Sequence, residues 1–149
     1  MKKSNNPLLY PLSWLYGLGV GLRNFLFNQG ILKQQAYPIP LICVGNITVG
    51  GTGKTPHVEL LISILREQYR IAVISRGYKR KSRGLGEVIL TSTAEEVGDE
   101  PKQIKQKYPE VRFVVDGNRR RAMRYLLALP EEERPEVVLL DDGFQHRYV

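Results

Sequence analysis

The sequence predicts an α/β fold with a mainly parallel β-sheet flanked by helices. Short apolar segments of strand length alternate with segments of helical periodicity, and this alternation is typical of parallel sheets whose strands are connected by helices. A glycine-rich segment also joins the first predicted strand to the next helix. The chain has 149 residues, which fits one domain and leaves little room for a second.

The predicted elements follow a boundary marked by Pro38 and Pro40. We expect residues 1–37 to form an N-terminal helix and linker, and residues 38–149 to form the α/β core. Asn118 can cap the last helix, because its side chain can accept a hydrogen bond from the first turn. The expected strands are 41–44, 71–75, 87–90, 111–115 and 137–140, and the expected helices are 55–68, 101–107 and one that begins after Asn118.

The N-terminal segment, residues 8–27, is apolar and aromatic with helical spacing. Trp14 and Tyr16 suit the headgroup level of a bilayer, so we expect a helix that lies on a membrane surface. A helix packed on the protein core and a membrane-spanning helix are the alternatives. Pro11 and Arg23 weaken the spanning alternative.

The charge is distributed unevenly. The formal net charge is +7, and no Asp or Glu precedes Glu59. A basic N-terminal region suggests an anionic partner, which could be a nucleic acid, a membrane surface or a phosphorylated substrate. We expect no nucleic-acid partner, because the aromatic residues are not interleaved with the basic runs as base stacking requires.

Cysteine usage excludes two classes of protein. Cys43 is the single cysteine of the sequence, so neither a disulfide framework nor a multi-cysteine zinc site is possible. Because Cys43 lies in an apolar run, we expect it to be a small buried hydrophobic residue.

The strongest chemical signal is a phosphate-binding loop between a predicted strand and a predicted helix. Its glycines allow backbone N–H groups to surround phosphate oxygens, and the helix N-terminus adds its positive dipole end. Lys54 can reach the β- and γ-phosphates, and the Thr55 hydroxyl can bind Mg²⁺. Thr48 departs from the strict pattern, which has glycine there. The loop consists of Thr48, Val49, Gly50, Gly51, Thr52, Gly53, Lys54 and Thr55.

Two acidic segments are further candidates. Asp141 and Asp142 follow a buried strand, where a Walker B carboxylate would orient Mg²⁺; an aspartate that only forms a turn is the alternative. Asp99 precedes a short helix and could act as a general base for an attacking hydroxyl. Helix capping by Asp99 or Glu100 is the alternative there.

The sequence has two clusters of basic residues, one after a predicted strand and one at or near a predicted helix start. We expect residues 76–83 to bind an anion, because ligands bind beyond the carboxyl ends of strands in doubly wound folds. For the second cluster we favour a solvated helix face. It contains Arg119, Arg120, Arg121 and Arg124.

Four segments occur in an order that resembles the tetraacyldisaccharide 4'-kinase family, the lipid A 4'-kinases. They are residues 44–56, 75–78, 98–101 and 141–147. The resemblance implies a P-loop NTPase-like fold. It also implies ATP- and Mg²⁺-dependent transfer of the γ-phosphoryl group to the 4'-hydroxyl of a tetraacyldisaccharide 1-phosphate, the lipid A precursor.

The resemblance also implies roles for individual residues. Asp99 matches the family's catalytic acidic residue, Asp141 and Asp142 match its metal-side acids, and Gln145 follows them as in the family. The N-terminal helix would dock the enzyme on the cytoplasmic face of the inner membrane as a peripheral protein.

One departure from the family is large, since its members continue well past residue 147 into a second domain. We therefore expect a partial chain with weak or no activity of its own. The alternative function is a membrane-associated, switch-type P-loop NTPase that acts through a protein partner. Val49 argues against it, because ParA- and MinD-like ATPases place a signature lysine at that position.

Overall fold

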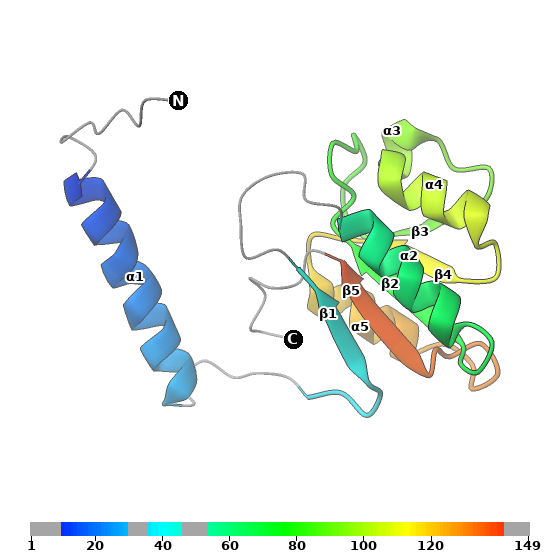
Figure 1. Ribbon diagram of the computed structural model, residues 1–149, viewed down its shortest axis with the longest axis horizontal. Coiled ribbons are helices and arrows are strands. Elements are labelled where there is room, and N and C mark those ends of the chain that lie inside the picture. Colours follow the sequence, from blue (N-terminus) through cyan, green and yellow to red (C-terminus); the bar gives the residue numbers. More distant parts are fainter. Residues whose placement is uncertain (1–9, 30–35, 46–53, 142–149) are drawn as a thin grey trace. The chain divides into compact units, whose positions relative to one another are not determined.

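The computed structural model describes residues 10–29, 36–45 and 54–141 (Figure 1). They form two compact units. One contains helix α1 (Tyr10–Asn28), so the helix expected over residues 8–27 is confirmed. Among the described residues, no helix combines the length and apolarity needed to cross a membrane.

The second unit is built on a five-stranded sheet in the order β1-β5-β2-β4-β3. The first four strands of that order run parallel, and β3 runs antiparallel to β4. The mainly parallel sheet is therefore confirmed. The strands are β1 (Leu41–Val44), β2 (Ile71–Ser75), β3 (Gly86–Val88), β4 (Arg112–Val115) and β5 (Val137–Asp141).

Helices cover both faces of the sheet (Figure 1). On one face lie α2 (Lys54–Leu65) and α4 (Asp99–Lys107), and on the other lies α5 (Arg119–Leu127). A short helix that the sequence analysis missed, α3 (Ala94–Val97), precedes α4. Its four residues are too few to show helical periodicity, although Thr93 and Glu96 form the capping box that announces its start.

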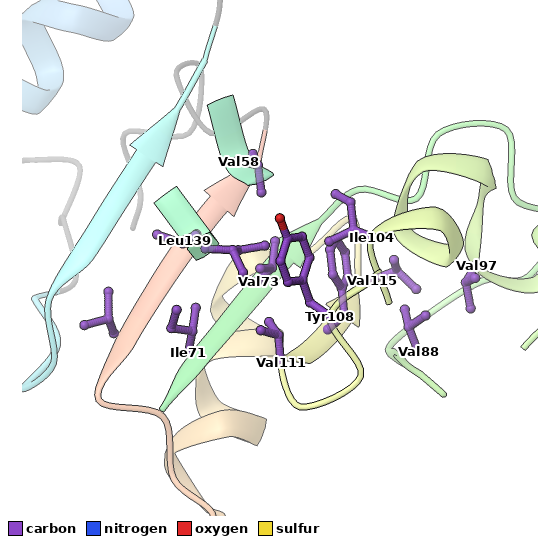
Figure 2. Close-up of a cluster of buried hydrophobic side chains, with 13 residues drawn as sticks. Val58, Ile71, Val73, Val88, Val97, Ile104, Tyr108, Val111, Val115 and Leu139 are labelled. Atoms are coloured by element: carbon purple, nitrogen blue, oxygen red, sulfur yellow. The ribbon is translucent and has the colours of Figure 1, made fainter. Parts of the chain in front are cut away.

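The hydrophobic core has two layers, one on each face of the sheet. Ile71 and Val73 of β2 face α2 and α4, whereas Ala72 and Ile74 face α5. Figure 2 shows the first layer, where Ile104 of α4 meets the strand residues. Every residue of β2 and β5 is buried, which explains why these strands are continuous apolar runs rather than alternating ones.

The expected burial of Cys43 is wrong, because Cys43 is exposed. It lies in β1, which pairs with β5 and ends the sheet on that side in the described part of the chain. An apolar run does not distinguish an edge strand from a central one, so only the strand order decides the exposure of this residue.

The expected cap of α5 is confirmed. The Asn118 side chain accepts a hydrogen bond from the Arg121 backbone N–H at 3.1 Å. Ala122, Met123 and Leu126 are fully buried against the sheet. The cap and this apolar face set where the helix begins and how it packs.

Candidate functional site

The carboxyl ends of β1, β5, β2 and β4 lie along one edge of the sheet, because these strands are parallel. Asp141, the last residue of β5, is paired in register with Val44, the last residue of β1. The strand that leads into the glycine-rich segment therefore ends beside the aspartate expected to serve a metal ion. Thr48 to Gly53, Asp142 and Gln145 lie outside the described residues.

Helix α2 begins at Lys54, so Lys54 and Thr55 both occupy its first turn. The backbone N–H groups of a first helical turn have no partner within the helix, and they favour an anion. Thr55 is half-buried. Pro56 is tolerated in the first turn because it needs no hydrogen-bond partner there.

Asp141 is held through both its side chain and its backbone. Its side chain is buried, and the Ser75 hydroxyl donates a hydrogen bond to Asp141 Oδ2 at 3.0 Å. Arg119 Nη2 donates to the Asp141 carbonyl oxygen at 3.2 Å. The residue expected to orient Mg²⁺ is thus fixed by contacts from two other elements.

Arg119 does not lie on a solvated helix face, so that expectation is wrong for this residue. Only 2% of it is exposed. Its guanidinium donates to the carbonyl oxygens of Asp116 and Asp141, which lie at the ends of β4 and β5. Arg119 joins the two strand ends across β2, which lies between them.

Asp116 follows β4 and was missed by the sequence analysis, although it directly follows a buried strand, as Asp142 follows β5. Only 1% of Asp116 is exposed. Its carboxylate accepts hydrogen bonds from Arg121 Nε at 2.6 Å, Arg121 Nη2 at 2.8 Å and the Asn118 backbone N–H at 2.8 Å.

The charge state of Asp116 follows from these contacts. Burial acts to raise its pKa, but the hydrogen bonds from Arg121 and Asn118, with the charges of Arg121 and Arg80, outweigh burial. The pKa of Asp116 therefore lies below its ordinary value of 3.8. Arg121 is exposed, as expected for a solvated helix face, and from that face it pairs with the buried Asp116.

Asp99 is the first residue of α4 and is exposed. The capping alternative is not observed, because Gly98 is the N-cap of α4 and no side chain caps it. Gly98 has a φ of +97°, and a Cβ at this position would lie 3.1 Å from the Tyr78 carbonyl oxygen. The start of α4 is therefore packed against the segment that follows β2.

The first basic cluster divides into two kinds of residue. Arg80 is half-buried and donates hydrogen bonds to the carbonyl oxygens of Val115 at 3.1 Å and Gly84 at 2.6 Å, so it supports the backbone. Arg76 and Lys79 are exposed. Lys81 and Arg83 are exposed as well, and anion binding by this cluster stays a prediction.

A parallel sheet in which one strand leads through a glycine-rich segment into a helix, beside a strand that ends in aspartate, defines the class of P-loop nucleotide-binding proteins. A family model described as tetraacyldisaccharide-1-P 4'-kinase matches residues 5–149. The chain belongs to this family, which confirms the resemblance.

Individual relatives agree with this assignment. The chain is 58% identical over 144 residues to a tetraacyldisaccharide 4'-kinase of Porphyromonas gingivalis, which covers 97% of the chain and 40% of the relative. It is 56% identical to the tetraacyldisaccharide 4'-kinase of Parabacteroides distasonis, and the match covers 97% of this chain and 39% of that relative. The chain thus spans about two fifths of the length of these relatives.

A solved structure agrees as well. The crystal structure described as the "apo" form of LpxK from Aquifex aeolicus in complex with ATP is 42% identical, with a TM-score of 0.83 over 95% of this chain and 45% of that one. None of these relatives supports the alternative of a switch-type NTPase.

Proposed function

We propose that this chain is the nucleotide-binding part of a kinase that transfers the γ-phosphoryl group of ATP to the 4'-hydroxyl of a tetraacyldisaccharide 1-phosphate, the lipid A precursor. The observation that carries the proposal is the pairing of Asp141 with Val44 in a member of this family. This pairing supports the proposal because Asp141, whose carboxylate we propose to bind the metal ion, lies beside the strand from which the segment Thr48 to Thr55 continues. In this proposal, residues 38–149 form the kinase core and residues 1–37 form a separate attachment region.

The donor atoms in this part of the chain suit Mg²⁺ bound together with nucleotide. Mg²⁺ prefers hard oxygen ligands and is usually held by one or two carboxylates together with substrate phosphates. The described residues contain no cluster of three or more His, Cys, Asp or Glu side chains that could hold a metal alone. Thr55, Asp141, Asp142 and Gln145 would hold the ion, which would neutralise charge on the phosphates.

Lys54 and Asp99 have distinct roles in the proposed reaction. Lys54, in the first turn of α2, stabilises negative charge on the transferred phosphoryl group. Asp99 accepts the proton of the 4'-hydroxyl group while the oxygen of that hydroxyl bonds to the γ-phosphorus. The bond between the γ-phosphorus and the β,γ-bridging oxygen breaks, and ADP leaves. The Asp99 carboxylate suits this role because it is exposed, and no hydrogen bond holds it among the described residues.

Helix α1 is proposed to place the enzyme on the membrane that holds its lipid substrate. Trp14, Leu18, Leu22 and Phe25 are all more than half exposed, and their spacing places them along one side of the helix. Such a stripe is suited to the interface of an anionic bilayer, with Trp14 at the headgroup level. The proposed location is the cytoplasmic face of the inner membrane, as a peripheral protein.

Phosphate transfer from radiolabelled ATP to tetraacyldisaccharide 1-phosphate tests this function. The assay compares this chain with the same chain joined to the remaining part of the Porphyromonas gingivalis relative. We expect the joined protein to be active and Lys54→Ala to remove most activity, a loss of several kcal/mol of transition-state stabilisation. Lys107→Ala is the control, because Lys107 lies at the far end of α4 and pairs with Glu59. Equal activity of the wild type and Lys54→Ala would refute the assignment.

A further inference from the structure

Ser75 ends β2, the strand beside β5, and its side chain is turned toward Asp141. Ile74 is paired in register with Leu140, so Ser75 and Asp141 follow at the same level of the sheet. The Ser75 Oγ lies 3.0 Å from Asp141 Oδ2, and both residues are less than a tenth exposed. This contact joins two strand ends inside the protein, away from solvent.

The direction of this hydrogen bond follows from the other contact of the same hydroxyl. The backbone N–H of Gly77 donates to Ser75 Oγ at 3.4 Å. A serine hydroxyl carries one hydrogen, and an N–H group cannot accept it. The hydroxyl hydrogen is therefore available to the Asp141 carboxylate, which is an acceptor when ionised.

A hydrogen bond of this kind positions a carboxylate, because a fixed partner on Oδ2 limits rotation of the carboxylate plane. Arg119 holds the carbonyl oxygen of the same residue, so backbone and side chain of Asp141 are both restrained. Partners that orient the ligands of a metal ion typically change its affinity by about 10- to 100-fold when they are removed.

We infer that Ser75 is a positioning residue for the divalent-cation site: its hydroxyl sets the orientation of the Asp141 carboxylate without touching nucleotide. The inference rests on the proposed function, which places Mg²⁺ at Asp141. In this inference Ser75 acts on the metal site through that carboxylate. It should therefore affect the affinity for metal in the presence of ATP, but not the affinity for ATP without metal.

The test uses this chain with Ser75→Ala, Ser75→Thr and a control, Ser92→Ala. Ser92 is also buried, and its Oγ accepts a hydrogen bond from the Ile89 backbone N–H, so its removal costs a comparable hydroxyl contact elsewhere. Electron paramagnetic resonance of Mn²⁺, with protein in excess over ATP, measures metal affinity. Calorimetry with ATP in EDTA measures nucleotide affinity without metal.

We expect Ser75→Ala to weaken Mn²⁺ binding by about 10-fold and to leave metal-free ATP affinity unchanged. Ser75→Thr keeps the hydroxyl and should restore metal affinity, whereas Ser92→Ala should leave it unchanged. If Ser75→Ala does not fold, Ser75→Cys keeps the side-chain shape with a weak donor and should show a loss in the same direction.

Three results would overturn the inference. The first is wild-type Mn²⁺ affinity in Ser75→Ala, or in Ser75→Cys where that variant replaces it. The second is an equal loss of Mn²⁺ affinity in Ser92→Ala. The third is a parallel loss of metal-free ATP affinity in Ser75→Ala, which would show a general structural effect. Failure of the wild type to bind ATP in either experiment would instead refute the proposed nucleotide site, and the inference with it.

Discussion

The backbones of Gly77 and Gly98 are in contact: a Cβ on Gly98 would lie 3.4 Å from the Gly77 carbonyl carbon, and one on Gly77 would lie 3.0 Å from the Val97 carbonyl oxygen. Both glycines also have positive φ angles, of 68° and 97°. This contact joins the segment after β2 to the start of α4. It therefore determines where Asp99, the residue after Gly98, is held.

Gly98→Ala should destabilise the protein. The added Cβ would meet the Tyr78 carbonyl oxygen at 3.1 Å, in a backbone conformation that residues other than glycine rarely adopt. We expect a loss of about 1–3 kcal/mol in the free energy of unfolding, measured by urea denaturation. Gly117→Ala is the control, because a Cβ there has no atom within 4 Å. Equal stability of the two variants would show that the contact is unimportant.

Asp99→Asn should separate catalysis from helix stability. The N-cap of α4 is Gly98 and no side chain caps the helix, so we expect little change in melting temperature. In the chain completed with the remaining part of a relative, loss of a general base should lower the rate about 10²- to 10⁴-fold while ATP affinity is kept. An unimpaired rate with a lowered melting temperature would instead return Asp99 to a structural role.

The buried Asp116 should make stability depend on acidity. Because its folded-state pKa lies below the ordinary 3.8, its contribution is complete above that value and is lost as pH falls through the lower folded pKa. Asp116→Asn should cost about 1.5–3 kcal/mol at neutral pH, since it removes charge-assisted hydrogen bonds from Arg121.

Urea denaturation at about pH 7 and about pH 3 measures this dependence. The wild type should lose more stability between the two pH values than Asp116→Asn does. Glu131→Gln serves as the control, because Glu131 is exposed. This variant should lose as much stability between the two pH values as the wild type does. An identical acid dependence in the wild type and Asp116→Asn would contradict the prediction.

Leu22→Glu should weaken binding to anionic liposomes if α1 lies on a membrane. Leu22 is 58% exposed on the stripe that includes Trp14 and Phe25. Removing a buried leucine from an apolar environment costs about 1.5–3 kcal/mol, which is roughly tenfold or more in partitioning. Leu90→Glu is a matched control, since Leu90 is 56% exposed in the other unit. Equal co-sedimentation of the two variants would argue against the membrane role of α1.

Several elements of this protein could be predicted from the sequence alone, because they depend on residues that are neighbours in the chain. The apolar segments that became β1, β2 and β5 are strands because they form uninterrupted hydrophobic runs of strand length. Asn118 caps α5 through a contact within four residues of chain. The position of Lys54 at the start of the helix that follows β1 could likewise be predicted from residues nearby in the sequence. These interactions join residues that are close together in the sequence, so each can be predicted from its own segment without knowledge of the rest of the fold.

Tertiary structure alone decided which of these segments meet. The order β1-β5-β2-β4-β3 places β1 at the edge and exposes Cys43. The same order brings Ser75 to Asp141, which is 66 residues away in the chain, and buries Arg119 across the ends of β4 and β5. Apolar runs of similar composition do not specify their neighbours in a sheet. The strand order, and the polar contacts that follow from it, emerge only when both faces of the sheet pack against their helices.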